Sequence, residues 1–468
     1  MSPARLGLAS RPQWLERVEH SPSDRRDGEP GVLHLGLGAF TRAHQAMVFD
    51  RLLASGDGRW GMHGVGMRQR GLVEALHAQD GLYAVRVADA AAVRWVVPAA
   101  LWRLSVLSTD REAVIQAMAR PVLRWITLTV TEKGYTPELA ALIAQGLMRR
   151  HTAGAAGLTL ASCDNLRSNG QHLHQLVLQA CESAKLRHWV DASCAFPSSM
   201  VDRIVPASSA ALRDQVVQEL GVVDESPLGT EGFWEWVIED RLADPSDASA
   251  LSAVGVRVTP DVHVYEDAKL RMLNGSHSAM ALIGAITGRA FIAHCIGHPP
   301  LREFVRRLIE REVAPHLQRR DWAEYQDALL ARFGNPHLRH SVHQIATDSS
   351  LKIPQRWPPS VEGQLRQGAS IEHHALAVAA WLRYGLAEDE QGRPYDISDP
   401  QAQWLRDVAA LQKTRPAHSL EQLLTRKDLW GPLLVEHTHW KARVAYWHQA
   451  VLAHGMDEAV NRLIREVP

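Results

Sequence analysis

The hydrophobic pattern of this chain changes at about residue 268. Before that point, short apolar runs typical of buried strands alternate with helical segments, and beyond it almost every segment has the 3.6-residue period of a helix. Alternating strands and helices predict a parallel sheet covered by helices. Because 468 residues exceed what one hydrophobic core usually supports, we predict two domains. These are an α/β domain over residues 1–262 and a mostly α-helical domain over residues 263–468.

A strand followed by two glycines begins the α/β part. Residues 31–35 form an apolar run that leads directly into GLGAFTR at 36–42 and a helical pattern extending to about Leu53. In Rossmann-like domains, free N–H groups at such a turn hold the pyrophosphate of a dinucleotide. Thr41 replaces the third glycine of the GxGxxG fingerprint, so an ordinary tight turn remains an alternative. The candidate cofactor-binding residues are Gly36, Gly38, Ala39, Phe40 and Arg42.

The second predicted strand, residues 60–67, bears on which dinucleotide would bind. In NAD-binding domains, an acidic residue near the end of this strand contacts the adenosine ribose. This chain has Arg68, Gln69 and Arg70 there instead. An arginine can pair with a 2′-phosphate, so NADP stays open beside NAD. Two alternating runs further along predict a β-hairpin: residues 83–87 and 93–97.

Two further buried strands, residues 125–130 and 157–162, are followed by the polar sequences TEKGY and CDNLRSNG. In open parallel sheets, ligands bind beyond the carboxyl ends of the strands, so both polar sequences belong to the candidate site. Glu132, Asp164 and Asn165 are the notable side chains. Aspartate and asparagine also commonly cap helices, and that alternative stays open for Asp164 and Asn165.

The stretch KLRMLNGSH, residues 269–277, combines an amine, a carboxamide and an imidazole at the head of the helical part. On an α-helix of about 100° per residue, Lys269, His277 and Asn274 fall at about 0°, 80° and 140°, so they project into one sector. Focusing Lys269 and Asn274 on one atom would require a bent lysine stem or an irregular turn. The alternative is an ordinary helix with a polar first turn. Just before it, residues 262–265 predict a late strand.

Residues 348–356 (DSSLKIPQR) interrupt the helical pattern and predict a loop. The interruption consists of Pro354 and two cations, Lys352 and Arg356. A lysine and an arginine on one loop could bind an anionic substrate group, because their charged donors pair well with a carboxylate. The alternative is a solvated loop without a binding role.

The charge and composition exclude several classes of partner. With 51 Lys+Arg against 52 Asp+Glu, the chain has no overall field to attract nucleic acid or an anionic membrane. No apolar stretch approaches the roughly 18 residues of a membrane span, and the polar lead-in over residues 1–30 lacks the apolar core of a signal peptide. The 4 cysteines form no CxxC pair and the 24 histidines no HExxH, so we expect no metal. We predict a cytoplasmic protein that binds a small molecule.

Six longer motifs occur in order over most of the chain. They are GLGAFTRAHQ at 36–45, TEKGY at 131–135, SCDNLRSNG at 162–170, FPSSMVDRIVP at 196–206, KLRMLNGSH at 269–277 and DSSLKIPQR at 348–356. Together they resemble the polyol-specific long-chain dehydrogenases, the family of mannitol 2-dehydrogenase and fructuronate reductase (mannonate oxidoreductase). The resemblance implies a Rossmann-like N-terminal domain, a mostly helical C-terminal domain of the 6-phosphogluconate-dehydrogenase type, a nicotinamide cofactor and metal-free chemistry.

By position in these motifs, the resemblance implies roles for five residues. Lys269 would be the catalytic acid/base, and Asn165 and Asn274 would be amides that hydrogen-bond the reacting oxygen. His277 would orient the substrate, and Glu132 would lie near the proton path of the lysine. The chemistry is consistent, because partial desolvation lowers the pKa of an ammonium toward neutrality and fixed carboxamide donors stabilise charge developing on oxygen.

The choice of substrate rests on fewer residues. Gln344 favours fructuronate reduction to mannonate, because mannitol dehydrogenases tend to have an arginine at its position. Arg339 is a further possible carboxylate clamp. Other segments fit a mannitol 2-dehydrogenase equally well, and a catalytically silent nucleotide-binding sensor is a remote alternative. The candidate substrate-binding residues are Asp202, Gln344, Lys352 and Arg356.

Overall fold

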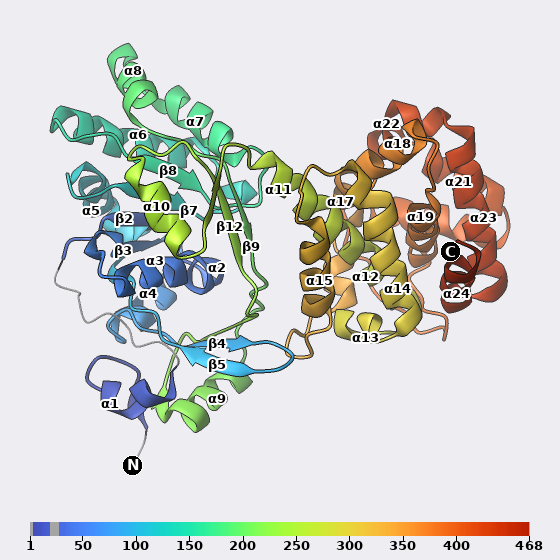
Figure 1. Cartoon of the computed structure of the whole chain (residues 1–468), viewed down its shortest axis with the longest axis horizontal. Helices are drawn as coiled ribbons and strands as arrows, with labels where there is room; N and C mark the ends of the chain where they lie inside the picture. Colours follow the sequence, from blue (N-terminus) through green and yellow to red (C-terminus); the bar gives the residue numbers. More distant parts are fainter. Residues whose placement is uncertain (1–2, 19–27, 468) are drawn as a thin grey trace. The chain divides into compact units, whose positions relative to one another are not determined.

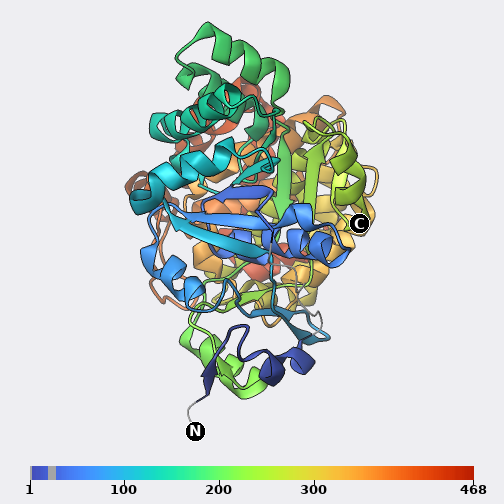
Figure 2. The same cartoon turned by 90° about the vertical axis from the view of Figure 1, so that its left-hand side faces the viewer.

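A five-stranded parallel sheet organises the first of two units in the computed structural model (Figures 1 and 2). The structure describes residues 3–18 and 28–467, and the chain divides into the units Met1–His263 and Val264–Pro468. The strand order β6-β3-β2-β7-β8 makes β2 and β7 the neighbours between which the winding of the chain reverses. The strands are β2 (Val32–Leu35), β3 (Met62–Gly66), β6 (Leu101–Val106), β7 (Trp125–Leu128) and β8 (Thr159–Ser162).

Side chains of the central strand alternate between two hydrophobic cores. Leu33 and Leu35 belong to one core and Val32 to the other, so both faces of the sheet are covered. The four buried strands predicted from the sequence are confirmed, since β2, β3, β7 and β8 pair in parallel. Their apolar runs are typical of strands buried on both faces. The helices on the Val32 side are α2 (Ala39–Ala43), α3 (Gln45–Ala54), α4 (Arg70–His77) and α10 (Ser246–Ala253), and those on the other are α5 (Leu107–Ala119), α6 (Pro137–Thr152), α7 (Asn169–Ala180) and α8 (Ala184–Ser193).

Smaller sheets complete the first unit. The predicted hairpin is confirmed, since β4 (Val85–Ala88) and β5 (Val93–Val96) pair antiparallel. β11 (Leu228–Thr230) extends this hairpin by pairing with β4 in parallel. A further sheet has the order β13-β12-β9. The remaining elements are β9 (Ser199–Asp202), α9 (Ala210–Leu220), β12 (Glu235–Glu239), β13 (Arg257–Thr259) and the 3₁₀ turn η2 (Gly58–Trp60).

The N-terminal segment is not only a polar lead-in, and this part of the prediction is wrong. β1 (Ala4–Arg5) pairs in parallel with β10 (Val222–Val223). Trp14, in the short helix α1 (Arg11–Trp14), is completely buried in an apolar cluster with Leu6. A few apolar residues in a polar segment were therefore enough to dock it. Residues 19–27 of the predicted lead-in lie outside the described residues.

The second unit consists of helices packed around two buried ones, α12 (Ser276–Ile286) and α19 (Glu372–Tyr384) (Figure 1). Every residue of α12 is buried. A helix that is surrounded on all sides belongs to the interior, and its neighbours need only one apolar face. The other helices of this unit after α12 are α13 (Ile292–Ile296), α14 (Pro299–Arg307), α15 (Trp322–Phe333), α16 (Val342–Ala346), α17 (Ser349–Arg356), α18 (Pro358–Arg366), α20 (Ala402–Ala410), α21 (Pro416–Leu424), α22 (Lys427–Glu436), α23 (Thr438–His454) and α24 (Met456–Glu466).

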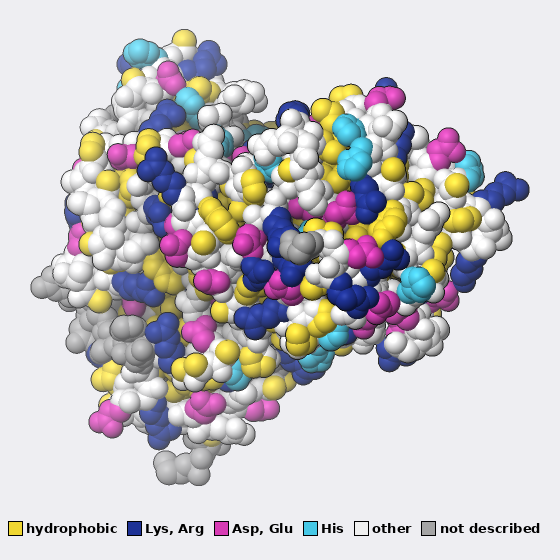
Figure 3. All heavy atoms as spheres, turned by 45° about the vertical axis from the view of Figure 1, so that its right-hand side comes forward, with side chains coloured by type: hydrophobic (Ala, Val, Ile, Leu, Met, Phe, Trp, Pro, Cys, Tyr) yellow, Lys and Arg dark blue, Asp and Glu magenta, His cyan; other side chains and the backbone are white. Residues whose placement is uncertain are grey.

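The surface carries charges of both signs. On the face drawn in Figure 3, Lys and Arg side chains are intermingled with Asp and Glu side chains. This distribution accords with a net charge of −1 and shows no large field of one sign on that face. Among the described residues, no helix is both long enough and apolar enough to cross a bilayer.

The strand predicted at residues 262–265 is wrong. His263–Ala268 form the helix α11, which continues into the π-helix η4 (Lys269–Gly275) and then into α12. A short apolar run such as VHVY fits a strand or a helical turn equally well. The long helical stretch that follows begins at His263, so these residues adopt the helical conformation.

The loop predicted at residues 348–356 is also wrong, because α17 occupies this segment. Asp348 has a left-handed backbone with φ of 55°, and the helix starts immediately after it. The distant carboxylate of Asp399 accepts hydrogen bonds from the N–H and the hydroxyl of Ser350, at 2.8 and 2.5 Å. This tertiary cap satisfies donors at the start of the helix, and the neighbouring sequence, which contains Pro354, gives no sign of it.

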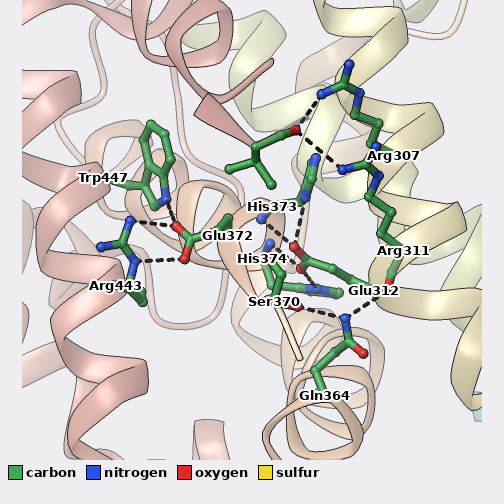
Figure 4. Close-up of polar contacts among 11 residues, drawn as sticks. Arg307, Arg311, Glu312, Gln364, Ser370, Glu372, His373, His374, Arg443 and Trp447 are labelled. Atoms are coloured by element: carbon green, nitrogen blue, oxygen red, sulfur yellow. Dashed lines mark hydrogen bonds and ion pairs between the residues drawn. The ribbon is translucent and has the colours of Figure 1, made fainter. Parts of the chain in front are cut away.

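A buried carboxylate joins two helices in the second unit (Figure 4). Glu312 lies in the π-helix η5 (Leu308–Val313). One of its oxygens accepts from the N–H and Nδ1 of His373 (2.7 and 2.8 Å), and the other from the same atoms of His374 (2.9 and 2.7 Å). Burial acts to raise the pKa of Glu312, but the two histidines outweigh it and lower the pKa to about 2. Glu312 therefore holds the start of α19 as a carboxylate.

Replacing Glu312 with Gln should destabilise the fold by about 3–5 kcal/mol at pH 7, because the buried donors lose their charged partner. The measurement is the free energy of unfolding in guanidinium chloride. Glu310→Gln in the same π-helix is the matched control, since its more exposed pair with Arg306 should contribute less than about 1 kcal/mol. Equal losses in the two variants would contradict the structural role of Glu312.

The same variant predicts a pH dependence of stability. A carboxylate whose pKa is lower in the folded than in the unfolded protein stabilises the fold above its unfolded pKa. The advantage of the natural protein over Glu312→Gln should therefore be complete at pH 7 and diminish as the pH falls from 4.5 toward about 2. Unfolding curves recorded at several values in this range test this expectation.

Candidate functional site

The glycine turn follows the carboxyl end of β2, beside the point between β2 and β7 where the winding of the chain reverses. Gly36 has φ of 100°, and a Cβ at this position would lie 2.2 Å from the carbonyl oxygen of Thr129, so only glycine fits. A Cβ on Gly38 would meet nothing nearer than the Gly36 carbonyl oxygen at 3.7 Å. The protein thus leaves space beside Gly38, which a dinucleotide pyrophosphate requires for close approach to the backbone. The turn fits such a cofactor.

Thr41, in place of the third fingerprint glycine, joins α2 to the sheet. Its hydroxyl contacts Nε2 of His34 at 2.6 Å and the hydroxyl of Thr129 at 2.5 Å. The other ring nitrogen of His34 bonds the hydroxyl of Thr127 at 2.8 Å. Burial lowers the pKa of His34 to about 3, so the ring is neutral and one nitrogen accepts a hydrogen bond. A buried polar network therefore positions the turn where a glycine would normally permit close packing.

The other predicted cofactor residues differ in their surroundings. Ala39 and Phe40 are partly exposed in the first turn of α2, whereas Arg42 is buried. The guanidinium of Arg42 donates to the carbonyl oxygens of Ser226 (2.6 Å) and Gly38 (3.2 Å). Arg42 thus supports the turn from inside the protein. A direct contact between Arg42 and a cofactor stays a prediction.

The end of β3 carries exposed basic groups. Arg68, Gln69 and Arg70 are exposed, and Arg70 pairs with Glu74 one helical turn further on, at 2.8 Å. An exposed pair of this kind contributes little to stability, so it leaves the arginine able to exchange partners. A contact of Arg68 or Arg70 with a 2′-phosphate stays a prediction.

The predicted residues Glu132 and Asn165 follow neighbouring strands of the sheet. β7 and β8 pair in parallel up to Leu128 opposite Ser162, so their loops leave from the same edge as the glycine turn. Glu132 begins the 3₁₀ turn η3 (Glu132–Gly134), and Asn165 lies between β8 and α7. Both residues are exposed. The structure thus brings the cofactor turn and these two side chains to one edge of the first unit.

Lys269 and Asn274 lie in the π-helix η4 and not in an α-helix. A π-helix bonds each carbonyl to the N–H five residues on, which places residues five apart on successive turns of the same side. Lys269 and Asn274 have this spacing, whereas an α-helix would separate them by about 140°. The structure therefore has the irregular turn that convergence of the amine and the carboxamide requires. Both side chains are partly exposed.

Two side chains from the α17–α18 junction hold the end of the π-helix. Arg356 Nη1 donates to the carbonyl oxygen of Asn274 at 3.1 Å, and Trp357 Nε1 donates to that of Gly275 at 3.0 Å. Arg356 also donates to the hydroxyl of Ser278 in α12. Because a π-turn interrupts the regular ladder of an α-helix, donors from outside the helix stabilise its carbonyl groups.

His277 lies between aromatic rings at the start of α12. Its ring centroid is 4.9 Å from that of Phe333 and 5.6 Å from that of His340, with which it stacks at 28°. Burial lowers the pKa of His277 well below 6.5, so the imidazole is neutral at physiological pH. Its Nε2 is buried and has no hydrogen-bond partner among the described residues. Such an atom costs stability unless a ligand or a water completes it, which suits a substrate-orienting role.

The predicted substrate-binding residues are distributed over both units. Lys352 and Arg356 lie on α17, and Lys352 Nζ donates to the carbonyl oxygen of Thr347 at 2.5 Å. Burial lowers the pKa of Lys352. Gln344 is exposed on α16, and Asp202 is buried at the end of β9. Contacts of these four residues with a substrate stay predictions.

Sequence reasoning missed several residues that shape the site. His34, Trp357 and His340 are linked to motif residues only through the fold, so no local pattern identifies them. Phe333, an aromatic neighbour of His277, likewise comes close to the motif only through the fold. In residues 3–18 and 28–467, no group of three or more His, Cys, Asp or Glu side chains is placed to hold a metal ion.

Replacing Trp357 with Phe should destabilise the fold by about 1–3 kcal/mol beyond the loss of packing, because the buried carbonyl of Gly275 loses its donor. Trp440→Phe is a matched control. Trp440 is equally buried, but its Nε1 has no hydrogen-bond partner among the described residues. Urea unfolding of both variants measures the difference. Indistinguishable losses would show that the Trp357 hydrogen bond contributes nothing.

Comparison with known proteins adds to this geometry. Residues 30–247 match the mannitol dehydrogenase Rossmann domain, and residues 261–452 match the mannitol dehydrogenase C-terminal domain. The chain is 33% identical to D-mannonate oxidoreductase of Escherichia coli, over 97% of this chain and 98% of that protein. It is 34% identical to mannitol 2-dehydrogenase of Phaeosphaeria nodorum, over 87% of this chain and 78% of that protein.

A solved structure is similar over the whole chain. It is Pseudomonas fluorescens mannitol 2-dehydrogenase in ternary complex with NAD and D-mannitol, with a TM-score of 0.82 and 28% identity over 98% of this chain and 99% of that one. The predicted fold class, a Rossmann-like domain followed by a mostly helical domain, is confirmed. This chain belongs to the mannitol dehydrogenase family and is an oxidoreductase of that family.

Proposed function

We propose that this protein reduces a keto sugar acid, fructuronate, to mannonate with NADH. The observation that supports this substrate is the positive charge around His277. Besides burial and the neighbouring His340, the groups that lower its pKa are the cations of Arg356, Arg332 and Lys352. Burial lowers the pKa of His340 as well, so the positive charge comes from the two arginines and the lysine. Basic side chains close to the predicted substrate-orienting imidazole favour an anionic substrate. A uronate has a carboxylate, whereas fructose and mannitol have none.

The relatives support the reaction class but do not distinguish between the substrates, so the proposal for the substrate rests on the residues of this chain. D-mannonate oxidoreductase and a mannitol 2-dehydrogenase are almost equally similar to this chain, at 33% and 34% identity. The second candidate function is therefore interconversion of fructose and mannitol, in line with the similar structure that holds D-mannitol. The same structure holds NAD, and the open space beside Gly38 supports NAD as the cofactor of this chain.

The proposed chemistry assigns one task to each polar group. A nicotinamide cofactor bound at the glycine turn would supply the hydride for the ketone carbon. Lys269, as an ammonium, would give its proton to the carbonyl oxygen as negative charge develops there. The carboxamides of Asn274 and Asn165 would donate hydrogen bonds to the same oxygen. In the oxidative direction Lys269 would accept the proton again, with Glu132 near its path to solvent.

The helical geometry supports two of these roles. The spacing of the π-helix places Lys269 and Asn274 on one side, so a proton donor and a hydrogen-bond donor can address one oxygen. His277 is neutral, so it can hold a substrate hydroxyl without adding charge. Lys352 and Arg356 would contribute the positive charge that a substrate carboxylate requires.

Replacing Lys269 with Ala should lower kcat for fructuronate reduction by about 10²- to 10⁴-fold, because general acid catalysis is lost. The measurement is NADH oxidation at saturating fructuronate. Lys185→Ala, at an exposed position of α8, should leave kcat within about twofold. Equal activity of the natural protein and Lys269→Ala would exclude the acid/base role. NADH binding without turnover of fructuronate or fructose would favour a nucleotide-binding sensor.

Replacing Lys352 with Met should raise KM for fructuronate by about 10- to 100-fold, because a charge-assisted hydrogen bond to the carboxylate is lost. KM for fructose should change by less than about twofold, since fructose has no carboxylate. Lys413→Met is the control, because Lys413 is an exposed lysine of the same unit that pairs with Glu388. A natural protein that prefers fructose to fructuronate would establish the second candidate function instead.

A further inference from the structure

One carboxylate connects the two loops that bear Glu132 and Asn165. Asp164 Oδ1 accepts a hydrogen bond from the N–H of Thr131 at 2.8 Å, and its Oδ2 accepts from the N–H of Val130 at 3.0 Å. The hydroxyl of Tyr135 donates to the same Oδ2 at 2.9 Å. Asp164 is 8% exposed, so little solvent competes for these donors. The loop after β8 is thereby bonded to the loop after β7.

The loop after β7 needs such support because its backbone is strained. Thr131 has φ of 64° and ψ of 166°, a region that only glycine normally occupies. A β-branched residue there persists only when its surroundings impose the conformation. Asp164 binds the N–H of this residue and of the one before it. Glu132 follows Thr131 directly, so the direction of its side chain depends on this strained residue.

The loop after β8 is fixed from the other side of Asp164. Asn169, at the start of α7, donates from Nδ2 to the carbonyl oxygen of Asp164 at 3.0 Å and to that of Ser199 at 2.8 Å. The Ser199 N–H in turn donates to Oδ1 of Asn169 at 2.9 Å. The carbonyl group of the Asp164–Asn165 peptide is therefore bonded to a side chain of α7 that is itself bonded to β9. Asn165 therefore follows a residue whose carboxylate and carbonyl group are both hydrogen-bonded.

We infer that Asp164 is a positioning residue that sets the loops of Glu132 and Asn165 in one fixed arrangement. The inference rests on the proposed function for the roles of those two side chains, but the arrangement itself does not. Asp164 has its oxygens directed at protein N–H and O–H groups and would not touch the substrate. The Tyr135 hydroxyl adds a third donor, and the two backbone N–H groups determine the geometry.

Asp164→Asn tests the inference most directly. Both carboxylate oxygens accept hydrogen bonds, so an amide must place an NH₂ group against at least one protein donor. The expected result is a kcat for fructuronate reduction lower by about 10- to 100-fold, with KM for NADH within about twofold. Tyr135→Phe keeps both backbone hydrogen bonds and should lower kcat by less than about threefold. A loss from Tyr135→Phe as large as that from Asp164→Asn would overturn the assignment to the backbone N–H groups.

Asp247→Asn separates positioning from a general loss of stability. Asp247 is buried in the same unit and accepts hydrogen bonds from Arg124 and from Trp125 Nε1. This variant should lower the melting temperature and leave kcat within about twofold. If Asp247→Asn reduces kcat as much as Asp164→Asn does, at a similar loss of melting temperature, Asp164 is only structural and the inference fails.

Hydrogen exchange gives a readout that needs no substrate. In Asp164→Asn, exchange of a peptide covering residues 129–136 should become at least about tenfold faster, because the N–H group of Val130 or of Thr131 loses its acceptor. The same peptide should be unchanged in Asp247→Asn. Unchanged exchange in Asp164→Asn would overturn the inference even if kcat falls. Faster exchange in a protein that turns over neither fructuronate nor fructose would support the positioning and reject the proposed function.

Discussion

The backbone of the helix that bears Lys269 and Asn274 depends on hydrogen-bond donors from outside that helix. A π-turn cannot satisfy its carbonyl groups through the regular α-helical ladder alone. Arg356 and Trp357 supply the donors, and each is 82 residues away in sequence from the carbonyl that it binds. The relative placement of the amine and the carboxamide is therefore a property of the packed helical unit and not of the motif that contains them.

The second π-helix of this unit is also hydrogen-bonded to a neighbouring helix, here through one of its own side chains. Glu312 uses its carboxylate to satisfy the first turn of α19 and two imidazoles at once. A buried polar group without a partner costs about 1–3 kcal/mol, so an alternative register of either helix would be penalised at several atoms together. These contacts give the unit one specific packing. Hydrophobic burial alone would tolerate several.

Much of the fold could be predicted because its signals are local. Strands buried on both faces and helices with a 3.6-residue period mark the division of the chain directly. The errors share a physical cause. α17 starts where Asp399 caps it from about 50 residues further along the chain, and residues 262–265 adopt the conformation of the long helix that follows. Motifs likewise select Lys269 and Asn274 as candidate site residues, but the π-turn in which both lie depends on distant partners such as Arg356.

Thr41 limits how freely this binding turn can be transferred between proteins. In the usual fingerprint the third glycine acts through the absence of a side chain, and any sheet that lets the helix approach can accept it. Thr41 acts through a hydroxyl that requires His34 on one strand and Thr129 just beyond the next. The turn is consequently matched to its own sheet. Engineering a different cofactor preference by grafting a glycine-rich turn would have to exchange all three positions together.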